Sequence, residues 1–170
     1  WGAEKLFPDV KSFAKFSDEI VSEAKGKSMS AYTILAYKNL PCDLQKFSLG
    51  RWHSDSFFSQ LKVFCFLSEV KDENGPLEIL MKTHSIGYKA MGLISGRYIK
   101  PSDFLKNKST RSYAKLDEGY IDAITKFGAK SRKLITKDRG ESFLVDSSVI
   151  HRASPVLSGD RYALCAYYRH

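Results

Sequence analysis

Short apolar runs rich in β-branched and aromatic residues recur along most of this chain, with turn-forming residues between them. Runs of this kind predict β-strands, because branched and aromatic side chains pack well on a pleated surface. The clearest break is the acidic Asn-Gly-Pro turn at residues 72–76. We expect strands at residues 32–37, 51–58, 61–70, 77–81, 133–136, 142–150 and 161–168.

Two segments follow a helical period instead. Residues 9–24 carry apolar side chains at roughly helical spacing, which predicts a helix that packs on one face. In residues 116–127, Leu116, Tyr120, Ile124 and Phe127 lie on one side of a second predicted helix. The order is a helix, several strands, a helical insertion and further strands. This order favours a mainly β fold, an antiparallel sandwich or barrel with helices packed outside.

Composition limits the class of protein. The 170 residues suit a single domain, and 43% hydrophobic with 27% charged residues excludes a disordered chain. No apolar run approaches the ~20 residues that a bilayer requires, and no secretory signal is visible. The three cysteines, Cys42, Cys65 and Cys165, fit no zinc motif. We therefore expect a cytoplasmic protein with reduced thiols and no membrane segment, and because it opens on Trp1, we expect further residues upstream.

Within residues 1–170 we expect a helical part at about 1–30, followed by a β core at about 31–170. A helical insertion at about 85–128 interrupts this core. The formal net charge is +8, which favours acidic partners or substrates. The basic residues are scattered, even in the densest stretch at 126–139, and no nucleic-acid-binding module surrounds them. The charge pattern therefore favours a solvated basic surface over a nucleic-acid site.

The candidate chemistry lies at three places along the predicted strands. His53 and Asp55 are two positions apart, so on a strand their side chains would project from the same face. His151 ends an apolar strand and precedes a turn marked by Pro155 and Gly159. Arg161 opens the next strand, ten positions after His151. If the chain folds back in this turn, Arg161 comes close to His151.

Two histidines and one carboxylate with open positions form the ligand set typical of non-haem Fe(II) oxygenases. An arginine near such a site can bind a carboxylate through two parallel hydrogen bonds. 2-Oxoglutarate, which chelates iron at one end and carries a second carboxylate at the other, would need such a partner. Tyr37 and Asn39, on or just after the preceding strand, could also reach this co-substrate, as could Thr83.

The segment Trp52-His53-Ser54-Asp55, the strand after it, the turn Glu73-Asn74-Gly75-Pro76-Leu77 and the Lys82–Ser85 segment resemble the phytanoyl-CoA dioxygenase (PhyH-like) family. The segment from Asp146 to His151, with Arg161, resembles that family's distal histidine and 2-oxoglutarate arginine. The resemblance covers about residues 50–168. It departs from the family pattern where Ser54 replaces a glutamine, where no Pro-Gly precedes His84, and where Arg152 replaces a small residue.

The resemblance implies a double-stranded β-helix, the cupin-like jelly roll, that binds Fe(II) and 2-oxoglutarate and uses O2. Carried over by position, His53, Asp55 and His151 are the metal ligands and catalytic centre, and Arg161 holds the co-substrate. The implied activity is a dioxygenase, a hydroxylase of a small and anionic organic substrate, that releases succinate and CO2.

Two alternatives stay open. One is a peptide or protein hydroxylase on the same scaffold. The other is a non-catalytic β-barrel binding module with a vestigial metal site, which the basic charge motivates. The substrate and the oligomeric state do not follow from the sequence.

Overall fold

Seven antiparallel strands form two sheets in the computed structural model, which describes residues 2–41, 50–94, 116, 118–127 and 132–169. The four-stranded sheet has the order β1-β7-β2-β5, and the three-stranded sheet has the order β4-β3-β6. The strands are β1 (Thr33–Asn39), β2 (Leu61–Phe66), β3 (Leu77–Leu80), β4 (Arg132–Ile135), β5 (Ser142–Asp146), β6 (Ile150–Ala153) and β7 (Arg161–Tyr167).

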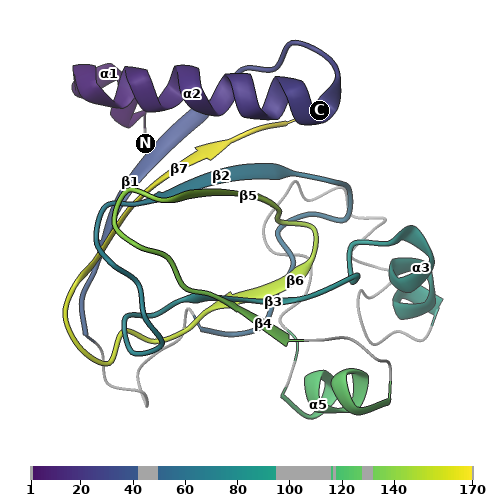
Figure 1. Cartoon of the computed structure of the whole chain (residues 1–170). Helices are drawn as coiled ribbons and strands as arrows, with labels where there is room; N and C mark the ends of the chain where they lie inside the picture. The colour runs from purple at the N-terminus through teal and green to yellow at the C-terminus, as the bar shows by residue number, and fades with distance from the viewer. Residues whose placement is uncertain (1, 42–49, 95–115, 117, 128–131, 170) are drawn as a thin grey trace.

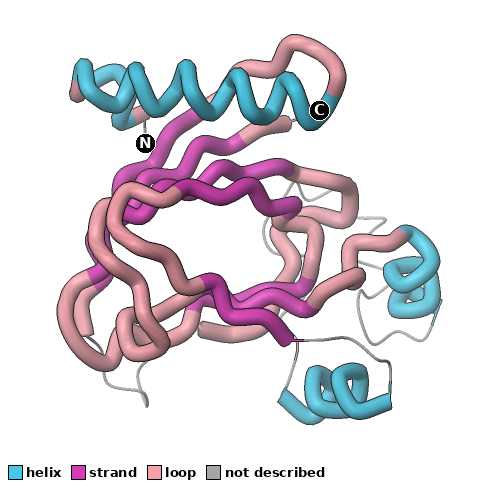
Figure 2. The backbone as a smooth tube through the Cα atoms, viewed as in Figure 1, coloured by secondary structure: helices cyan, strands magenta, loops and turns pink. Residues whose placement is uncertain are grey.

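The two sheets face each other (Figures 1 and 2), and part of the space between them is filled by apolar side chains. Leu77 and Ile79 of β3 pack there against Val145 of β5, with Phe64 of β2 beside them. Residues of both sheets share this cluster because alternate side chains of each strand point to the same face. The predicted mainly β fold with flanking helices is confirmed.

The helices pack on the outside of the sheets, as Figure 1 shows. α2 lies over the outer face of the four-stranded sheet, where Val10 and Val21 join a cluster with Ile34, Val63 and Leu164. None of the helices that the structure describes is long and apolar enough to cross a bilayer. The helices are α1 (Ala3–Leu6), α2 (Pro8–Lys25), α3 (Ile86–Ile94) and α5 (Glu118–Phe127).

The ends of α2 carry recognisable signals. Pro8 occupies the start, where its missing N–H leaves no helical bond unmade. Gly26 follows the last turn with φ 64°, and its N–H donates to the carbonyl oxygen of Glu23 at 3.2 Å. Glycine adopts this left-handed conformation without steric cost. The predicted helix at 9–24 therefore exists, with one more residue at each end.

Three predicted strands differ from the structure. The strand expected at residues 61–70 ends at Phe66, and Val70 makes an isolated bridge to Lys137. Residues 142–150 form two strands, because the Asp146 carboxylate accepts hydrogen bonds from the backbone N–H groups of Ser148 and Gln60 and closes a turn. Residues 51–58 form no regular strand. Only Trp52 and His53 make isolated bridges, to Leu116 and His151, before the chain leaves the sheet.

The helical insertion expected at 85–128 is present at both of its ends, as α3 and α5, while its middle lies outside the described residues. Ile121 of α5 packs with Trp52, Leu80 and Ile150 on the outer face of the three-stranded sheet. Cys42 also lies outside the described residues. Cys65 and Cys165 are free thiols. The division of residues 1–170 into one domain with a helical start stays a prediction.

Asp18 ties α2 to the sheet. Its carboxylate accepts hydrogen bonds from the Tyr168 hydroxyl at 2.7 Å, the backbone N–H of Ala31 at 2.9 Å and the Ser30 hydroxyl at 3.0 Å. Hydrogen bonds to a charged acceptor are stronger than those between neutral groups. One side chain thus joins the helix, the loop after it and the end of the last strand.

Asp18→Ala should therefore lower the free energy of unfolding by about 2–3 kcal/mol, since it leaves three donors without their acceptor. Urea denaturation followed by circular dichroism measures this loss. Glu19→Gln, on the exposed side of the same helix, is the matched control and should change stability by less than about 0.5 kcal/mol. Equal stabilities of the two variants would show that the Asp18 contacts do not hold the helix in place.

Candidate metal centre and cavity

The backbones of two distant histidines are paired directly. The N–H of His53 donates to the carbonyl oxygen of His151 at 2.9 Å, and the N–H of His151 donates back to His53 at 2.8 Å. Directly opposed residues of an antiparallel pair project on the same face. Their ring centroids accordingly lie 4.5 Å apart. This bridge brings together ligand candidates that are almost one hundred positions apart in the chain.

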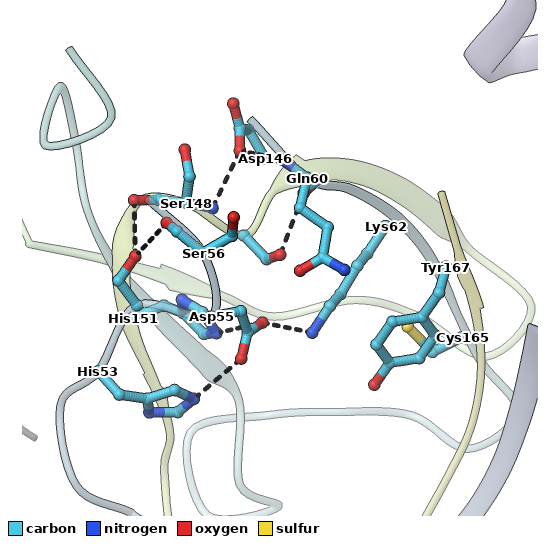
Figure 3. Close-up of polar contacts among 12 residues, drawn as sticks. His53, Asp55, Ser56, Gln60, Lys62, Asp146, Ser148, His151, Cys165 and Tyr167 are labelled. Atoms are coloured by element: carbon cyan, nitrogen blue, oxygen red, sulfur yellow. Dashed lines mark hydrogen bonds and ion pairs between the residues drawn. The ribbon is translucent and has the colours of Figure 1, made fainter. Parts of the chain in front are cut away.

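Asp55 completes the cluster from the loop after His53. Its backbone N–H donates to the carbonyl oxygen of Ser147, in the turn between β5 and β6, at 3.1 Å. Its carboxylate then lies between the two imidazoles, with Oδ1 3.7 Å from His53 Nε2 and Oδ2 3.4 Å from His151 Nε2 (Figure 3). The three possible ligand atoms all lie within 4.8 Å of one another. The three predicted residues are thus brought together.

The Ser54 hydroxyl, inside the motif, lies within hydrogen-bond distance of two carbonyl oxygens, those of Ser56 at 2.9 Å and Ser148 at 3.0 Å. These contacts hold the loop against the β5–β6 turn. The chain therefore leaves the sheet at the point where Asp55 has to turn inward. The expectation that His53 and Asp55 lie on one strand is wrong, because Asp55 lies in the loop after His53. Their side chains nevertheless converge.

Both imidazoles are oriented for metal binding. His53 Nδ1 donates to the carbonyl oxygen of Arg51 at 2.7 Å, and His151 Nδ1 donates to that of Val149 at 2.9 Å. A donor at Nδ1 leaves the lone pair at Nε2 for a metal. Burial, and then the neighbouring His151, lower the pKa of His53, so its imidazole is neutral at pH 7. Two nitrogens and one carboxylate with open positions suit Fe(II).

Lys62 of β2 forms an ion pair with Oδ2 of Asp55. Burial by itself raises the pKa of the Asp55 carboxyl, but His151 and Lys62 outweigh it, and this pKa lies well below its usual range. Burial likewise lowers the pKa of Lys62, and the charge of Asp55 more than offsets this, so the net shift is upward. Asp55 is therefore a carboxylate and Lys62 an ammonium at any pH near neutral.

The cluster opens into a cavity of about 330 Å³ between the two sheets. Its wall combines the triad with a few polar residues and a band of apolar side chains. The lining residues are Tyr37, Asn39, His53, Asp55, Lys62, Phe64, Phe66, Leu77, His151, Ala153, Arg161, Ala163 and Tyr167.

Arg161 lies at the other end of this cavity from Lys62. On β7, Arg161 pairs with Asn39 of β1, whereas Tyr167, at the far end of β7, pairs with Lys62. The Asn39 side-chain oxygen accepts hydrogen bonds from the Arg161 guanidinium, at 3.4 Å from Nε and 3.2 Å from Nη2. Burial lowers the pKa of Arg161. A fixed cation therefore faces the cavity opposite the candidate metal centre.

Gly75 packs directly behind Arg161. A Cβ on this residue would lie 2.8 Å from the carbonyl oxygen of Ser154 and 3.3 Å from Arg161 Nη1. Its φ of 74° is also unfavourable for any residue with a side chain. The Asn-Gly turn seen in the sequence thus allows the loop to approach the guanidinium closely.

Tyr37 lines the cavity, and its contact with a co-substrate stays a prediction. Its hydroxyl lies 3.5 Å from that of Tyr167. Burial raises the pKa of Tyr37, and burial raises the pKa of the nearby Cys165 thiol to about 12. Both groups are neutral, so the Tyr37 hydroxyl offers a hydrogen bond to a ligand in the cavity but no charge.

Thr83 does not reach the cavity. It is fully buried in the turn after β3, where its hydroxyl donates to the carbonyl oxygen of Leu80 at 2.8 Å and accepts from the N–H of Ile150 at 2.8 Å. The placement of Thr83 therefore does not support a contact with a co-substrate. The Thr83 hydroxyl instead holds the backbone of Ile150, the residue before His151.

Lys62 also lines the cavity, although no motif in the sequence indicates it. It shares the inward face of β2 with Phe64 and Phe66, and a lysine among aromatic residues on the buried face of a strand is the signal that could have found it. Arg152, where the sequence departs from the PhyH-like pattern, lies on β6. It pairs with Glu78 on the neighbouring strand at 2.9 Å and stacks 4.5 Å from the Trp52 ring, behind the two histidines.

The sequence matches no protein-family model, and no curated protein matches it. Solved structures do match. The epimerase SnoN from nogalamycin biosynthesis, in complex with Fe3+, alpha ketoglutarate and nogalamycin RO, aligns with a TM-score of 0.68 at 13% identity. The alignment covers 98% of this chain and 60% of SnoN. This chain shares its fold.

Two further structures agree with this. The alpha ketoglutarate dependent carbocyclase SnoK, also from nogalamycin biosynthesis, has a TM-score of 0.60 at 15% identity over 95% of this chain and 58% of its own. EctD from S. alaskensis, with 2-oxoglutarate and 5-hydroxyectoine, has a TM-score of 0.55 at 15% identity. The alignment covers 85% of this chain and 45% of EctD. The fold is the double-stranded β-helix, as predicted. Membership of the PhyH-like family stays a prediction.

Proposed function

We propose that this protein is an Fe(II)- and 2-oxoglutarate-dependent oxygenase that hydroxylates a small organic substrate. One observation carries the proposal. A single cavity holds the His53, Asp55 and His151 cluster at one end and Arg161 at the other, with apolar side chains between them. This layout complements a short molecule that chelates a metal at one end and carries a second carboxylate at the other.

Each residue has a defined task in this proposal. His53 and His151 offer Nε2, and Asp55 offers a carboxylate oxygen, so that three protein ligands leave positions open for small molecules. Arg161, steadied by Asn39, binds the distal carboxylate of 2-oxoglutarate through its guanidinium. Phe64, with the other apolar residues of the wall, excludes water. Iron, when bound, supplies the oxidising chemistry in which O2 is consumed and 2-oxoglutarate becomes succinate and CO2.

The structural neighbours support the class of cofactor. SnoN was solved with Fe3+ and alpha ketoglutarate, and EctD with 2-oxoglutarate and with bound Fe. The neighbours differ in reaction, because SnoN is an epimerase and SnoK is a carbocyclase. Hydroxylation, a small-molecule substrate and a cytoplasmic location are accordingly our proposals, and a peptide hydroxylase on the same scaffold is the alternative.

An anaerobic titration tests the proposal without a substrate. The purified protein is loaded with Fe(II), and 2-oxoglutarate is then added while the visible metal-to-ligand charge-transfer band is followed. We expect a saturable band with a stoichiometry of one, because both ends of the co-substrate find a partner. Folded protein that gives no such band would contradict the proposal and would favour a non-catalytic binding module with a vestigial site.

A further inference from the structure

Lys62 is a buried lysine on the wall of the candidate site. Only 7% of its surface is exposed. Its Nζ pairs with Asp55 Oδ2 and lies 4.4 Å from the centroid of the Tyr167 ring (Figure 3). A buried ammonium is costly unless it is paired. The chain therefore maintains a positive charge at this point of the cavity.

The charges around the cavity do not balance when the proposed ligands are counted. Among the described residues of its lining, Asp55 is the one acid, while Lys62 and Arg161 are the two fixed cations. The protein thus contributes +1. A divalent metal adds +2, and 2-oxoglutarate adds −2. One positive charge stays uncompensated beside the buried Lys62 and His151 side chains, which is unfavourable unless another anion enters.

This extra charge lies at the metal end of the cavity. Lys62 of β2 pairs with Tyr167 of β7. Arg161 lies six residues before Tyr167 on β7 and pairs with Asn39 of β1. The distal carboxylate of 2-oxoglutarate is assigned to Arg161, and its other carboxylate is assigned to the metal. A substrate has to approach the metal to react, so the group within reach of Lys62 belongs to the substrate.

We propose that Lys62 binds an acidic group of the substrate, which makes the substrate class a small organic acid. This inference rests on the proposed function of the same site. The Lys62 ammonium, held between Asp55 and the Tyr167 ring, shares its charge with the incoming carboxylate. The net charge of +8 on the whole chain would draw such anions toward the protein.

The test uses propionate as a probe and propionamide as its neutral counterpart. Protein loaded anaerobically with Fe(II) and saturating 2-oxoglutarate is titrated with each compound, and the position of the charge-transfer band is recorded. We expect propionate, but not propionamide, to shift the band with saturation. A fall in amplitude at unchanged position would mean that propionate displaces 2-oxoglutarate, and this result would overturn the inference.

Variants assign the effect to Lys62. Lys62→Met removes the charge at similar volume and should raise the propionate concentration for half-saturation at least about tenfold, the equivalent of one lost ion pair. Lys62→Gln, which keeps a donor toward Asp55, should behave in the same way and guards against misfolding of the first variant. Lys38→Met is the control, because Lys38 pairs with Asp160 on the surface.

The outcomes separate the two proposals. If the wild-type protein gives no charge-transfer band, the proposed function fails. If the band forms but the response to propionate is absent, or is unchanged in both Lys62 variants, the proposed function stands and the assignment of Lys62 to an acidic substrate is wrong.

Discussion

Asp55→Ala is expected to weaken binding of Mn²⁺, a redox-stable probe for Fe(II), by more than about a hundredfold and to abolish succinate formation. The change removes the one carboxylate of the cluster, and loss even of an outer partner of a metal ligand costs 10–100-fold. His53→Ala and His151→Ala should have effects of the same order, since each removes one nitrogen of a three-ligand set. Isothermal titration with Mn²⁺ measures the loss directly.

Asp55→Ala also leaves Lys62 buried without its partner, and an unpaired buried charge can destabilise the fold by several kcal/mol. The double variant Asp55→Ala with Lys62→Met removes both charges together. We expect it to recover folding, by circular dichroism, but not Mn²⁺ binding. Asp160→Ala, which breaks the surface pair with Lys38, should bind Mn²⁺ normally. Wild-type Mn²⁺ affinity in folded Asp55→Ala would contradict the ligand assignment.

Arg161→Met should raise the dissociation constant for 2-oxoglutarate about a hundredfold while leaving that for Mn²⁺ within about twofold. The guanidinium lies at the end of the cavity away from the triad, so its loss removes the partner of the distal carboxylate alone. Truncating one side of a buried, hydrogen-bonded charge pair costs about 2–5 kcal/mol. The anaerobic charge-transfer titration gives the dissociation constant for 2-oxoglutarate, and isothermal titration gives that for Mn²⁺.

Arg161→Lys keeps a charge but loses the planar pair of donors, so we expect an intermediate affinity. Arg139→Met, in an exposed turn, is the matched control and should not change the titration. An unchanged 2-oxoglutarate affinity in Arg161→Met would remove this residue from the co-substrate site, whereas a parallel loss of Mn²⁺ binding would indicate a structural role instead.

Local patterns predicted most of the strands. β1, β2, β3, β4 and β7 each fall in or beside an expected run, because alternation and side-chain shape act within a few residues. The predictions failed where a side chain competes with the sheet for backbone groups. Asp146 splits one expected strand by accepting from Ser148 and Gln60. The loop of Ser54 and Asp55 turns inward because the β5–β6 turn supplies acceptors to both residues.

The sequence by itself determined which kinds of residue make up the candidate site. These are two histidines and a carboxylate that suit a metal, and an arginine that suits a ligand carboxylate. These are chemical identities, and each can be read along the chain. Only the tertiary structure decided which of them meet. It paired His53 with His151, placed Arg161 at the far end of the cavity and buried Thr83 elsewhere. It also placed the ammonium group of Lys62, a residue of β2, beside the carboxylate of Asp55. Strand pairing joins residues far apart in sequence, and local propensity carries no information about that register.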